Sequence, residues 1–176
     1  MKLVLPSIEY KESYLEAVVE LRGVEKKKRE IEKSIIEQSE KRSADFAELV
    51  KILRGRAEGK YLPEGYVPNT YFWLVDGERF IGWLDIRHSL TEHLREIGGH
   101  IGYAIRPSER GKGYGNKILE LALPKAQELG IKDVRITCDA DNTPSAKIIE
   151  KNGGVFENIK TTSDGVPKRR YWINLK

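Results

Sequence analysis

Apolar and polar residues follow two different periods along the chain, and these periods predict both helices and strands. Residues 2–5, KLVL, predict a short strand that Pro6 ends. Ser7 is a typical N-cap, and the apolar residues after it recur at helical spacing until Gly23. The charge-rich residues 25–51 keep apolar side chains at helical intervals, which predicts a pair of solvated helices with a narrow apolar stripe.

Strand patterns dominate the middle of the chain. After a loop marked by proline and glycine, residues 70–76 and 79–88 flank Asp76-Gly77, which is a strong signal for a tight antiparallel hairpin. A polar connector at residues 89–99 then leads to another strand at residues 100–106.

The second half of the chain alternates between helical and strand patterns. Helical periodicity from residue 114 ends at Gly130, residues 134–139 predict a buried strand, and residues 142–151 predict a short helix. Two closing strands follow, around residues 155–160 and 169–175. Because a strand, a helix and a strand in succession imply a right-handed crossover, the strands that flank the first of these helices are expected to form a parallel pair.

The composition is that of one globular domain. The chain has 176 residues, of which 39% are hydrophobic and 33% charged, and no apolar run approaches membrane-spanning length. The first residues lack the long apolar segment of a signal peptide, so export is not expected. The single cysteine, Cys138, excludes an intramolecular disulfide and a multi-cysteine metal site, and both fit a cytoplasmic protein.

The net charge of +4 is mildly basic. Such an excess fits an ordinary solvated surface, and it also fits nucleic acid or an anionic cofactor as a partner. The basic run Lys26–Arg29 could touch RNA, but short charge runs are usually solvated helix faces. Nucleic acid is therefore not the expected partner.

The most informative local signal is RPSERGKGYGNK at residues 106–117, which follows a predicted strand and opens a helix. It places Gly111, Gly113 and Gly115 among basic side chains. Glycines permit close backbone approach and a helix start presents free N–H groups, so this pattern is typical of a phosphate site. A structural turn is the alternative, and neither the Walker lysine nor the Rossmann glycine spacing is present.

The positions of Arg110, Gly113 and Gly115 in RGKGYG resemble the signature of the GNAT superfamily of acyl-CoA N-acyltransferases. The resemblance implies an α+β fold, with a central twisted mixed β-sheet of about six to seven strands flanked by helices. It implies that the pyrophosphate of coenzyme A is bound, largely through main-chain N–H groups, by Arg110, Gly111, Lys112, Gly113, Tyr114, Gly115 and Asn116. It also implies that the preceding strand pairs with the pantetheine arm through the main chain of Tyr103, Ala104 and Ile105.

A second block, residues 137–154, is similar to the family segment in which an Asn follows a strand and a helix ends in Glu-Lys-x-Gly. Its matching positions imply cofactor contacts by Asn142, Ser145 and Lys147. Where the family often has a tyrosine that protonates the departing thiolate, this chain has Ile149. Tyr171 and Cys138 are candidate substitutes, and a structural role is the alternative for both.

Acyl transfer to an amine also requires a group that accepts a proton from the amine. His100 is the preferred base and Glu96 the second, while the alternative for His100 is a hydrogen-bonded strand histidine without chemistry. The resemblance implies that main-chain N–H groups near Ile105 polarise the thioester carbonyl. The acidic residues that could face the acceptor are Asp85, Glu92, Glu96, Asp139 and Asp141.

Together these signals predict one GNAT-like N-acetyltransferase domain over residues 1–176, with the charged helical segment 25–60 covering the acceptor side. The expected reaction moves an acetyl group from acetyl-CoA directly to a primary amine of a small molecule or peptide in a ternary complex. No metal ion and no membrane partner are expected, and the protein is expected to be a monomer or a homodimer. The alternative is a catalytically weak acyl-CoA-binding or sensing module, and the acceptor and the acyl chain length stay open.

Overall fold

The computed structural model describes residues 1–24, 30–41 and 45–175, which form both helices and strands. The strands are β1 (Lys2–Val4), β2 (Asn69–Asp76), β3 (Arg79–Arg87), β4 (Ile101–Ile105), β5 (Asp133–Asp139), β6 (Val155–Thr161) and β7 (Pro167–Asn174). The α-helices are α1 (Lys11–Arg22), α2 (Glu30–Lys41), α3 (Phe46–Gly55), α4 (Tyr114–Glu128) and α5 (Thr143–Lys151). Shorter helical turns lie at Ile8–Tyr10, Arg56–Glu58, Leu94–Gly98 and Pro107–Glu109.

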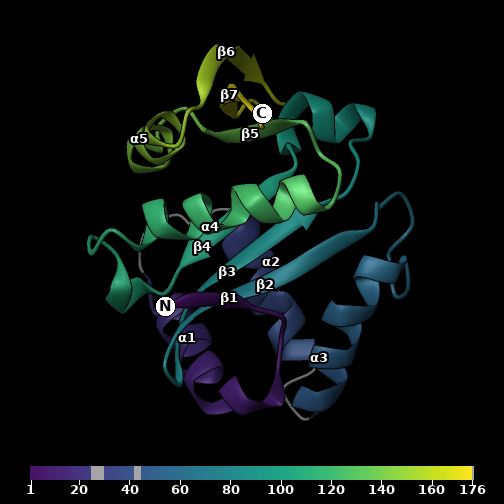
Figure 1. Cartoon of the computed structure of the whole chain (residues 1–176), viewed down its shortest axis with the longest axis vertical. Helices are drawn as coiled ribbons and strands as arrows, with labels where there is room; N and C mark the ends of the chain where they lie inside the picture. The colour runs from purple at the N-terminus through teal and green to yellow at the C-terminus, as the bar shows by residue number, and fades with distance from the viewer. Residues whose placement is uncertain (25–29, 42–44, 176) are drawn as a thin grey trace.

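The strands form two antiparallel sheets. The first has the strand order β1-β2-β3-β4, and the second has the order β5-β7-β6. Figure 1 shows the second sheet and α5 at the top, the first sheet below, and α4 crossing the space between them. The predicted α+β class, with seven strands flanked by helices, is confirmed.

The expected parallel pair on either side of α4 does not form. β4 and β5, both fully described, share no ladder. Gly99, two residues before β4, instead forms an isolated antiparallel bridge with Ile136 in the middle of β5. Next to this joint, the His100 N–H donates to the Arg135 carbonyl at 2.7 Å. Beyond it, side chains from α4 and α5 pack between the two sheets, so the outer edge of β4 stays open.

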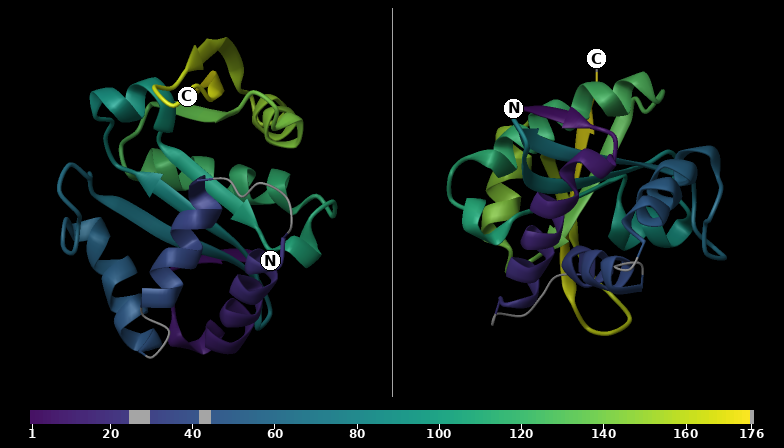
Figure 2. Two further views of the ribbon diagram at one scale, coloured as in Figure 1. Left: turned by 180° about the vertical axis from the view of Figure 1, so that it is seen from behind. Right: turned by 90° about the horizontal axis from the view of Figure 1, so that it is seen from below.

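Two cores cover the two faces of the first sheet. One core lies between the sheets and joins α4 and α5 to side chains such as Leu74 and Leu84. The other packs α1, α2 and α3 on the opposite face, against side chains such as Trp73 and Trp83. Figure 2 shows α2 lying across this face between α1 and α3. Because successive strand residues point to opposite faces, β2 and β3 contribute to both cores.

Most local signals of the first half are confirmed. Ser7 accepts a hydrogen bond from the Glu9 N–H, Gly23 ends α1, and β2 and β3 form the predicted hairpin. The polar connector contains the helical turn Leu94–Gly98, which its mixed pattern did not predict. Within the described ranges, no helix is both long and apolar enough to cross a membrane.

The charged segment 25–60 forms α2 and α3 where it is described, and both helices pack on the first sheet. Residues 25–29 and 42–44 lie outside the described residues. The basic run Lys26–Arg29, considered above as an RNA contact, is among them.

Candidate functional site

The outer edge of β4 carries main-chain groups that β3 does not use. On the inner edge, the Arg106 N–H donates to the Ile81 carbonyl and the Arg87 N–H donates to the His100 carbonyl. Hydrogen-bonded positions alternate in an antiparallel ladder, so the even-numbered residues of β4 bond to β3. The N–H and C=O groups of Tyr103 and Ile105 therefore point away from β3, toward the second sheet. Ala104, in contrast, directs its main chain to β3 and is buried.

The loop after β4 is exposed and holds unpaired N–H groups. Gly111 and Gly113 adopt φ values of +79° and +87°, and a Cβ at either position would meet nothing within 4 Å. The main-chain N–H groups of residues 111–115 donate to no residue that the structure describes. Because the first N–H groups of a helix lack intrahelical acceptors, this loop and the start of α4 together form a site suited to an anion.

Carboxylates engage the basic side chains of this loop. Arg110 donates to Glu32 of α2 at 2.7 Å and to the Ile105 carbonyl at 3.0 Å. Lys112 pairs with Glu109 at 3.0 Å, and the same carboxylate pairs with Arg79. The Arg110 side chain thus ties the loop to α2 and β4, and the main chain supplies the open donors.

The first turn of α4 is partly built for packing. A Cβ at Gly115 would lie 2.5 Å from Ile148 Cδ1, so this glycine lets α4 approach α5 closely. Tyr114 packs against the core between the sheets. Asn116 Oδ1 is buried and has no hydrogen-bond partner among the described residues.

The start of α5 meets β4 across the open edge. Asn142 caps the helix by accepting a hydrogen bond from the Ser145 N–H, and the Ser145 hydroxyl lies 2.9 Å from the Tyr103 hydroxyl. Burial raises the pKa of Tyr103 to about 12, although the hydrogen bond with Ser145 opposes this shift. Lys147 is exposed on α5. Tyr103 and Ser145, predicted from two separate blocks, are thus brought together.

The positions considered for the missing tyrosine are in the core. Ile149 and Tyr171 are fully buried, and the Tyr171 hydroxyl donates to Glu150 at 3.1 Å. Cys138 is 7% exposed and packs between the sheets. These environments favour the structural alternative for Tyr171 and Cys138.

His100 fastens β4 to β5. Its ring Nδ1 accepts a hydrogen bond from the main-chain N–H of Arg135 at 2.9 Å. The main-chain N–H of His100 donates to the Arg135 carbonyl. Burial lowers the pKa of His100 to about 4, and the positive charges of Arg87, Arg95 and Arg135 add to this shift. The imidazole is therefore neutral at pH 7 and holds a proton poorly. This geometry favours the structural alternative over the preferred role as a base.

The structure does not gather the candidate acidic residues at one place. Glu96 pairs with Lys160 and lies 3.9 Å from Arg170, on the side of the second sheet. Asp85 lies on β3, where it accepts a hydrogen bond from Asn69 and pairs with Arg87 at 3.1 Å. The other three lie elsewhere: Asp139 pairs with Lys168 at 2.6 Å, and Glu92 and Asp141 are exposed.

The sequence did not predict the role of Arg106, the first residue of the glycine-rich segment. Arg106 is 4% exposed and pairs with Glu16 and Glu20 of α1 at 3.0 and 2.6 Å. Burial alone would raise the pKa of Glu20, but hydrogen bonds from Arg106 and Ser108 outweigh it and lower this pKa. Glu16 and Glu20 are four residues apart on one helix face, which is the signal that could have indicated a shared cation.

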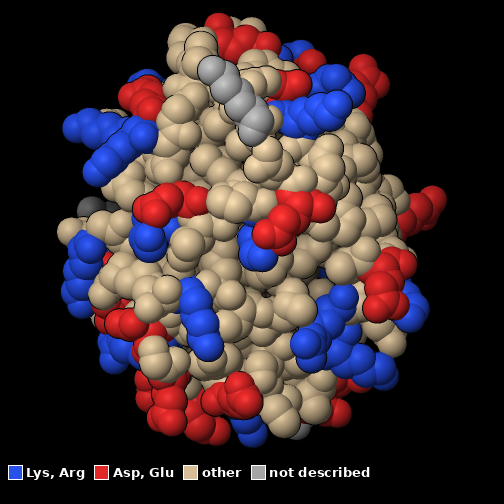
Figure 3. Space-filling model, viewed as in Figure 1, with Lys and Arg blue, Asp and Glu red and all other residues tan. Residues whose placement is uncertain are grey.

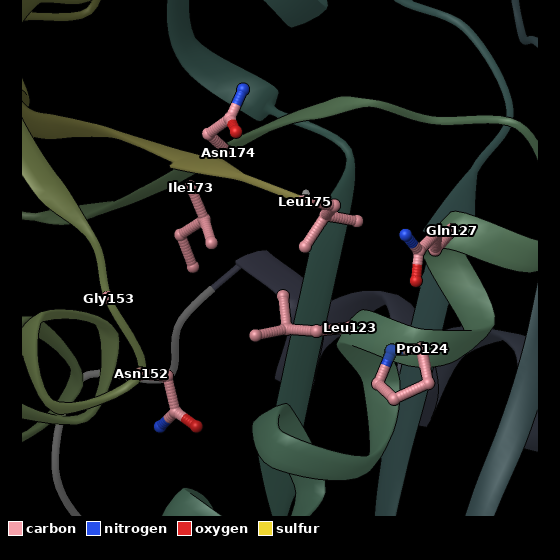
Figure 4. A pocket seen from close by; sticks show the side chains of 8 residues that line it. All are labelled: Leu123, Pro124, Gln127, Asn152, Gly153, Ile173, Asn174 and Leu175. Carbon is pink, nitrogen blue, oxygen red and sulfur yellow. The ribbon is translucent and has the colours of Figure 1, made fainter.

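A shallow cavity of about 320 Å³ lies away from this loop. Its lining combines leucine, isoleucine and proline with amide side chains: Leu123, Pro124, Gln127, Asn152, Gly153, Ile173, Asn174 and Leu175 (Figure 4). Leu123 follows Tyr114 by nine residues along α4, which places the cavity roughly 14 Å from the anion site.

The surface charges do not indicate a polyanion site on the face that Figure 3 shows, where basic and acidic side chains are interspersed. The described residues contain no cluster of three or more His, Cys, Asp or Glu side chains that could hold a metal ion.

The family model described as an acetyltransferase (GNAT) domain matches residues 12–155. Two mycothiol acetyltransferases match a shorter region of 88 residues. The protein from Geodermatophilus obscurus is 26% identical over 49% of this chain, and that from Corynebacterium glutamicum strain R is 28% identical over 50%. Each match spans only 29% of the length of the relative.

Solved structures are similar over nearly the whole chain. The ribosomal-protein alpha-N-acetyltransferase RimL in complex with coenzyme A has a TM-score of 0.68 at 15% identity, covering 98% of this chain and 93% of RimL. The microcin C7 self-immunity acetyltransferase MccE, bound to acetyl-CoA and AMP, has a TM-score of 0.66 at 16% identity, covering 98% and 91%. A spermidine N-acetyltransferase SpeG variant from Vibrio cholerae has a TM-score of 0.60 at 14% identity, covering 99% and 95%. At these identities the likeness concerns the fold.

Proposed function

Because the chain belongs to the acetyltransferase (GNAT) domain family, we propose that it transfers an acetyl group from acetyl-CoA to a primary amine. The observation that carries this proposal is the exposed loop at residues 111–115, next to the open edge of β4, whose main-chain N–H groups have no acceptor among the described residues. The acceptors named for RimL and SpeG are a ribosomal protein and spermidine, and both carry amino groups. This supports an amine as the acceptor here.

In this proposal, acetyl-CoA lies along the open edge of β4. The main chain of residues 111–115 and the start of α4 bind the pyrophosphate. The pantetheine arm runs beside the outward main-chain groups of Tyr103 and Ile105, which places it near the hydroxyl groups of Tyr103 and Ser145. Asn142 orients the start of α5, and exposed Lys147 is available to the cofactor phosphates.

The proposed chemistry is direct transfer in a ternary complex. The nitrogen of the neutral amine attacks the thioester carbon, and the carbon–sulfur bond breaks as the amide forms. An outward N–H of β4 stabilises the negative charge that develops on the carbonyl oxygen. The thiolate leaves, and either solvent or the Tyr103–Ser145 hydroxyl pair protonates it, since a thiol is a good leaving group.

The proton of the amine leaves through water in this scheme. His100 is a poor acceptor because its pKa is about 4, and Glu96 is already paired with Lys160. Turnover by a His100→Asn variant and a Glu96→Gln variant checks this step. Loss of turnover in either variant, with acetyl-CoA binding intact, would identify that side chain as the base.

Calorimetry and thermal unfolding with acetyl-CoA test the cofactor site. Acetyl-CoA at 100 times its Kd should stabilise the protein by about 2.7 kcal/mol. Gly113→Ala should bind at least about tenfold more weakly, because a Cβ at its φ of +87° forces the loop to rearrange. Gly165→Ala is the matched control, with a φ of +82° in the β6–β7 turn and nothing nearby, and it should bind normally.

A thiol-release assay with a panel of amines separates the enzyme from the alternative, an acyl-CoA sensor. Release of coenzyme A that depends on an added amine supports the transferase. Binding of acetyl-CoA without release in the presence of any amine supports the sensor, and absence of both contradicts the proposal.

A further inference from the structure

Arg56 is a buried cation for which the described residues supply no counter-ion. It lies in the helical turn after α3 and is 7% exposed, and its Nε has no hydrogen-bond partner in the described parts of the chain. Its contacts are with Tyr71 of β2: Nη1 donates to the tyrosine hydroxyl at 3.0 Å, and the guanidinium lies 5.7 Å from the ring centre. Among the described residues, no carboxylate lies within ion-pair distance of Arg56, although burial of an unpaired charge costs free energy.

Other buried arginines differ in this respect. Arg106 pairs with two carboxylates of α1, and Arg135 pairs with Glu157 at 2.5 Å. Arg135 also has an unpartnered Nε, but its charge is balanced. Arg56 is therefore suited to receive an anion from outside the described chain.

The position of Arg56 connects it to the open edge of β4. Tyr71 lies opposite Asp85 on β3, and Asp85 lies opposite Gly102 on β4, so the three share one face of the sheet. Neighbouring strands are about 4.8 Å apart, which places Tyr71 roughly 10 Å from Gly102. Ile31 of α2 covers this face near Gly102.

The charged side chains between Gly102 and Arg56 are not all balanced by a partner of opposite charge. Asp85 is already balanced by Arg87 and accepts a hydrogen bond from Asn69. The unbalanced positive charge on this face of the sheet is therefore that of Arg56, on the side away from Gly102. A guanidinium beside a hydroxyl is well suited to carboxylate or phosphate oxygens.

We propose that Arg56 and Tyr71 bind an acidic group of the acceptor, so that the substrate is a primary amine with a carboxylate or phosphate at its far end. This inference rests on the proposed transferase function. In this proposal the acidic group lies beside Arg56 and Tyr71, and the amine extends from there toward the open edge of β4, roughly 10 Å away. Such a site selects against a polyamine, because a second ammonium group would meet the buried guanidinium.

Four acceptors with the same six-carbon chain test this inference: 6-aminohexanoate, 6-aminohexyl phosphate, hexylamine and 1,6-diaminohexane. The wild-type protein should use at least one acidic acceptor with a kcat/KM at least about tenfold above hexylamine, and should use the diamine least. The carboxylate and phosphate arms identify which acidic group is preferred. Equal use of hexylamine, or preference for the diamine, overturns the inference.

Two variants test whether Arg56 causes the preference for an acidic acceptor. Arg56→Gln should bring the ratio of kcat/KM between the acidic acceptor and hexylamine close to one, mainly through KM. Arg54→Gln removes the same charge from an exposed position on α3, and should leave the ratio unchanged. An unchanged ratio in Arg56→Gln overturns the assignment.

Two measurements keep the test independent of folding defects and of the transferase proposal. If Arg56→Gln does not fold, inhibition of the wild-type protein decides. Hexanoate should compete with the amine, and hexanamide, which has the same chain without the negative charge, should inhibit at least about tenfold more weakly. Equal inhibition by the two compounds overturns the inference. Failure of acetyl-CoA to bind the wild-type protein contradicts the proposed function. Normal binding and turnover without an acidic preference contradict only the role of Arg56.

Discussion

At the residue scale, His100 makes the stability of the protein sensitive to acid. Its pKa is about 4 in the folded protein, against an ordinary value of about 6.5. Between these values the unfolded chain binds a proton that the folded protein does not, so this contribution is present at neutral pH and is lost as the pH falls. We expect His100 alone to lower the free energy of unfolding by about 2 kcal/mol between pH 7 and pH 5.

Urea unfolding of two variants separates the titration from the hydrogen bond. His100→Asn retains an oxygen that can accept the Arg135 N–H but does not titrate, so its stability should depend less on pH than that of the wild type. His100→Ala leaves this buried N–H unpaired and should be less stable by about 1–3 kcal/mol already at pH 7. The same pH dependence in His100→Asn and in the wild type would show that the histidine does not titrate as described.

Sequence reasoning at this scale succeeded where the chemistry is local. The Ser7 cap depends on residues within one helical turn, and the sequence shows it directly. The environment of His100 instead depends on Arg135 and Arg87, which come from other strands. Arg56 had no local signal at all, because its isolation depends on which carboxylates the fold keeps away from it.

At the scale of elements, Gly99 forms the joint between the two sheets. Its φ of 73° and ψ of 179° belong to a region that only glycine occupies readily, and a Cβ there would lie 2.7 Å from the Arg135 carbonyl oxygen. We expect Gly99→Ala to lower the free energy of unfolding by about 3 kcal/mol or more, from backbone strain and from a clash with β5. Urea denaturation measures this loss.

Gly130, at the end of α4, provides the control for Gly99. It also has a positive φ, of +81°, but a Cβ there would meet nothing within 4 Å. Gly130→Ala should therefore cost only the backbone term, about 1–2 kcal/mol. Equal losses in the two variants would mean that the contact with Arg135 does not contribute.

The helices and strands, like single residues, were predicted correctly where their contacts are between neighbours in the sequence. Alternation and Asp76-Gly77 predicted the β2–β3 hairpin, because its pairing is between neighbours in the sequence. The prediction of a parallel pair of β4 and β5 was wrong, because the sequence does not show how far the side chains of α4 and α5 hold the two sheets apart. That separation leaves the main chain of Tyr103 and Ile105 open, so the part of the fold that was predicted wrongly is the part that forms the candidate site.

At the scale of the whole molecule, the two cores depend on the same strands. Leu74 and Leu84 face α4 and α5, while their neighbours Trp73 and Trp83 face α1–α3. Loss of either core exposes one face of β2 and β3, which then lose packing needed by the other core. The molecule should therefore unfold as one cooperative unit, although its strands form two sheets.

Leu49→Ala and Leu119→Ala test this coupling, because Leu49 lies in the core with α1–α3 and Leu119 in the core between the sheets. Each substitution should cost about 3 kcal/mol through lost burial and a residual cavity. Fluorescence of Trp73 and Trp83 in a Trp172→Phe background reports the first core, and hydrogen exchange of β5 and β7 amides reports the second. In each variant both probes should report the same loss in free energy of unfolding, since β2 and β3 pack in both cores. Damage confined to the probe of the mutated core would show instead that the sheets unfold separately, and that the gap between them opens without disturbing the packing of α1–α3.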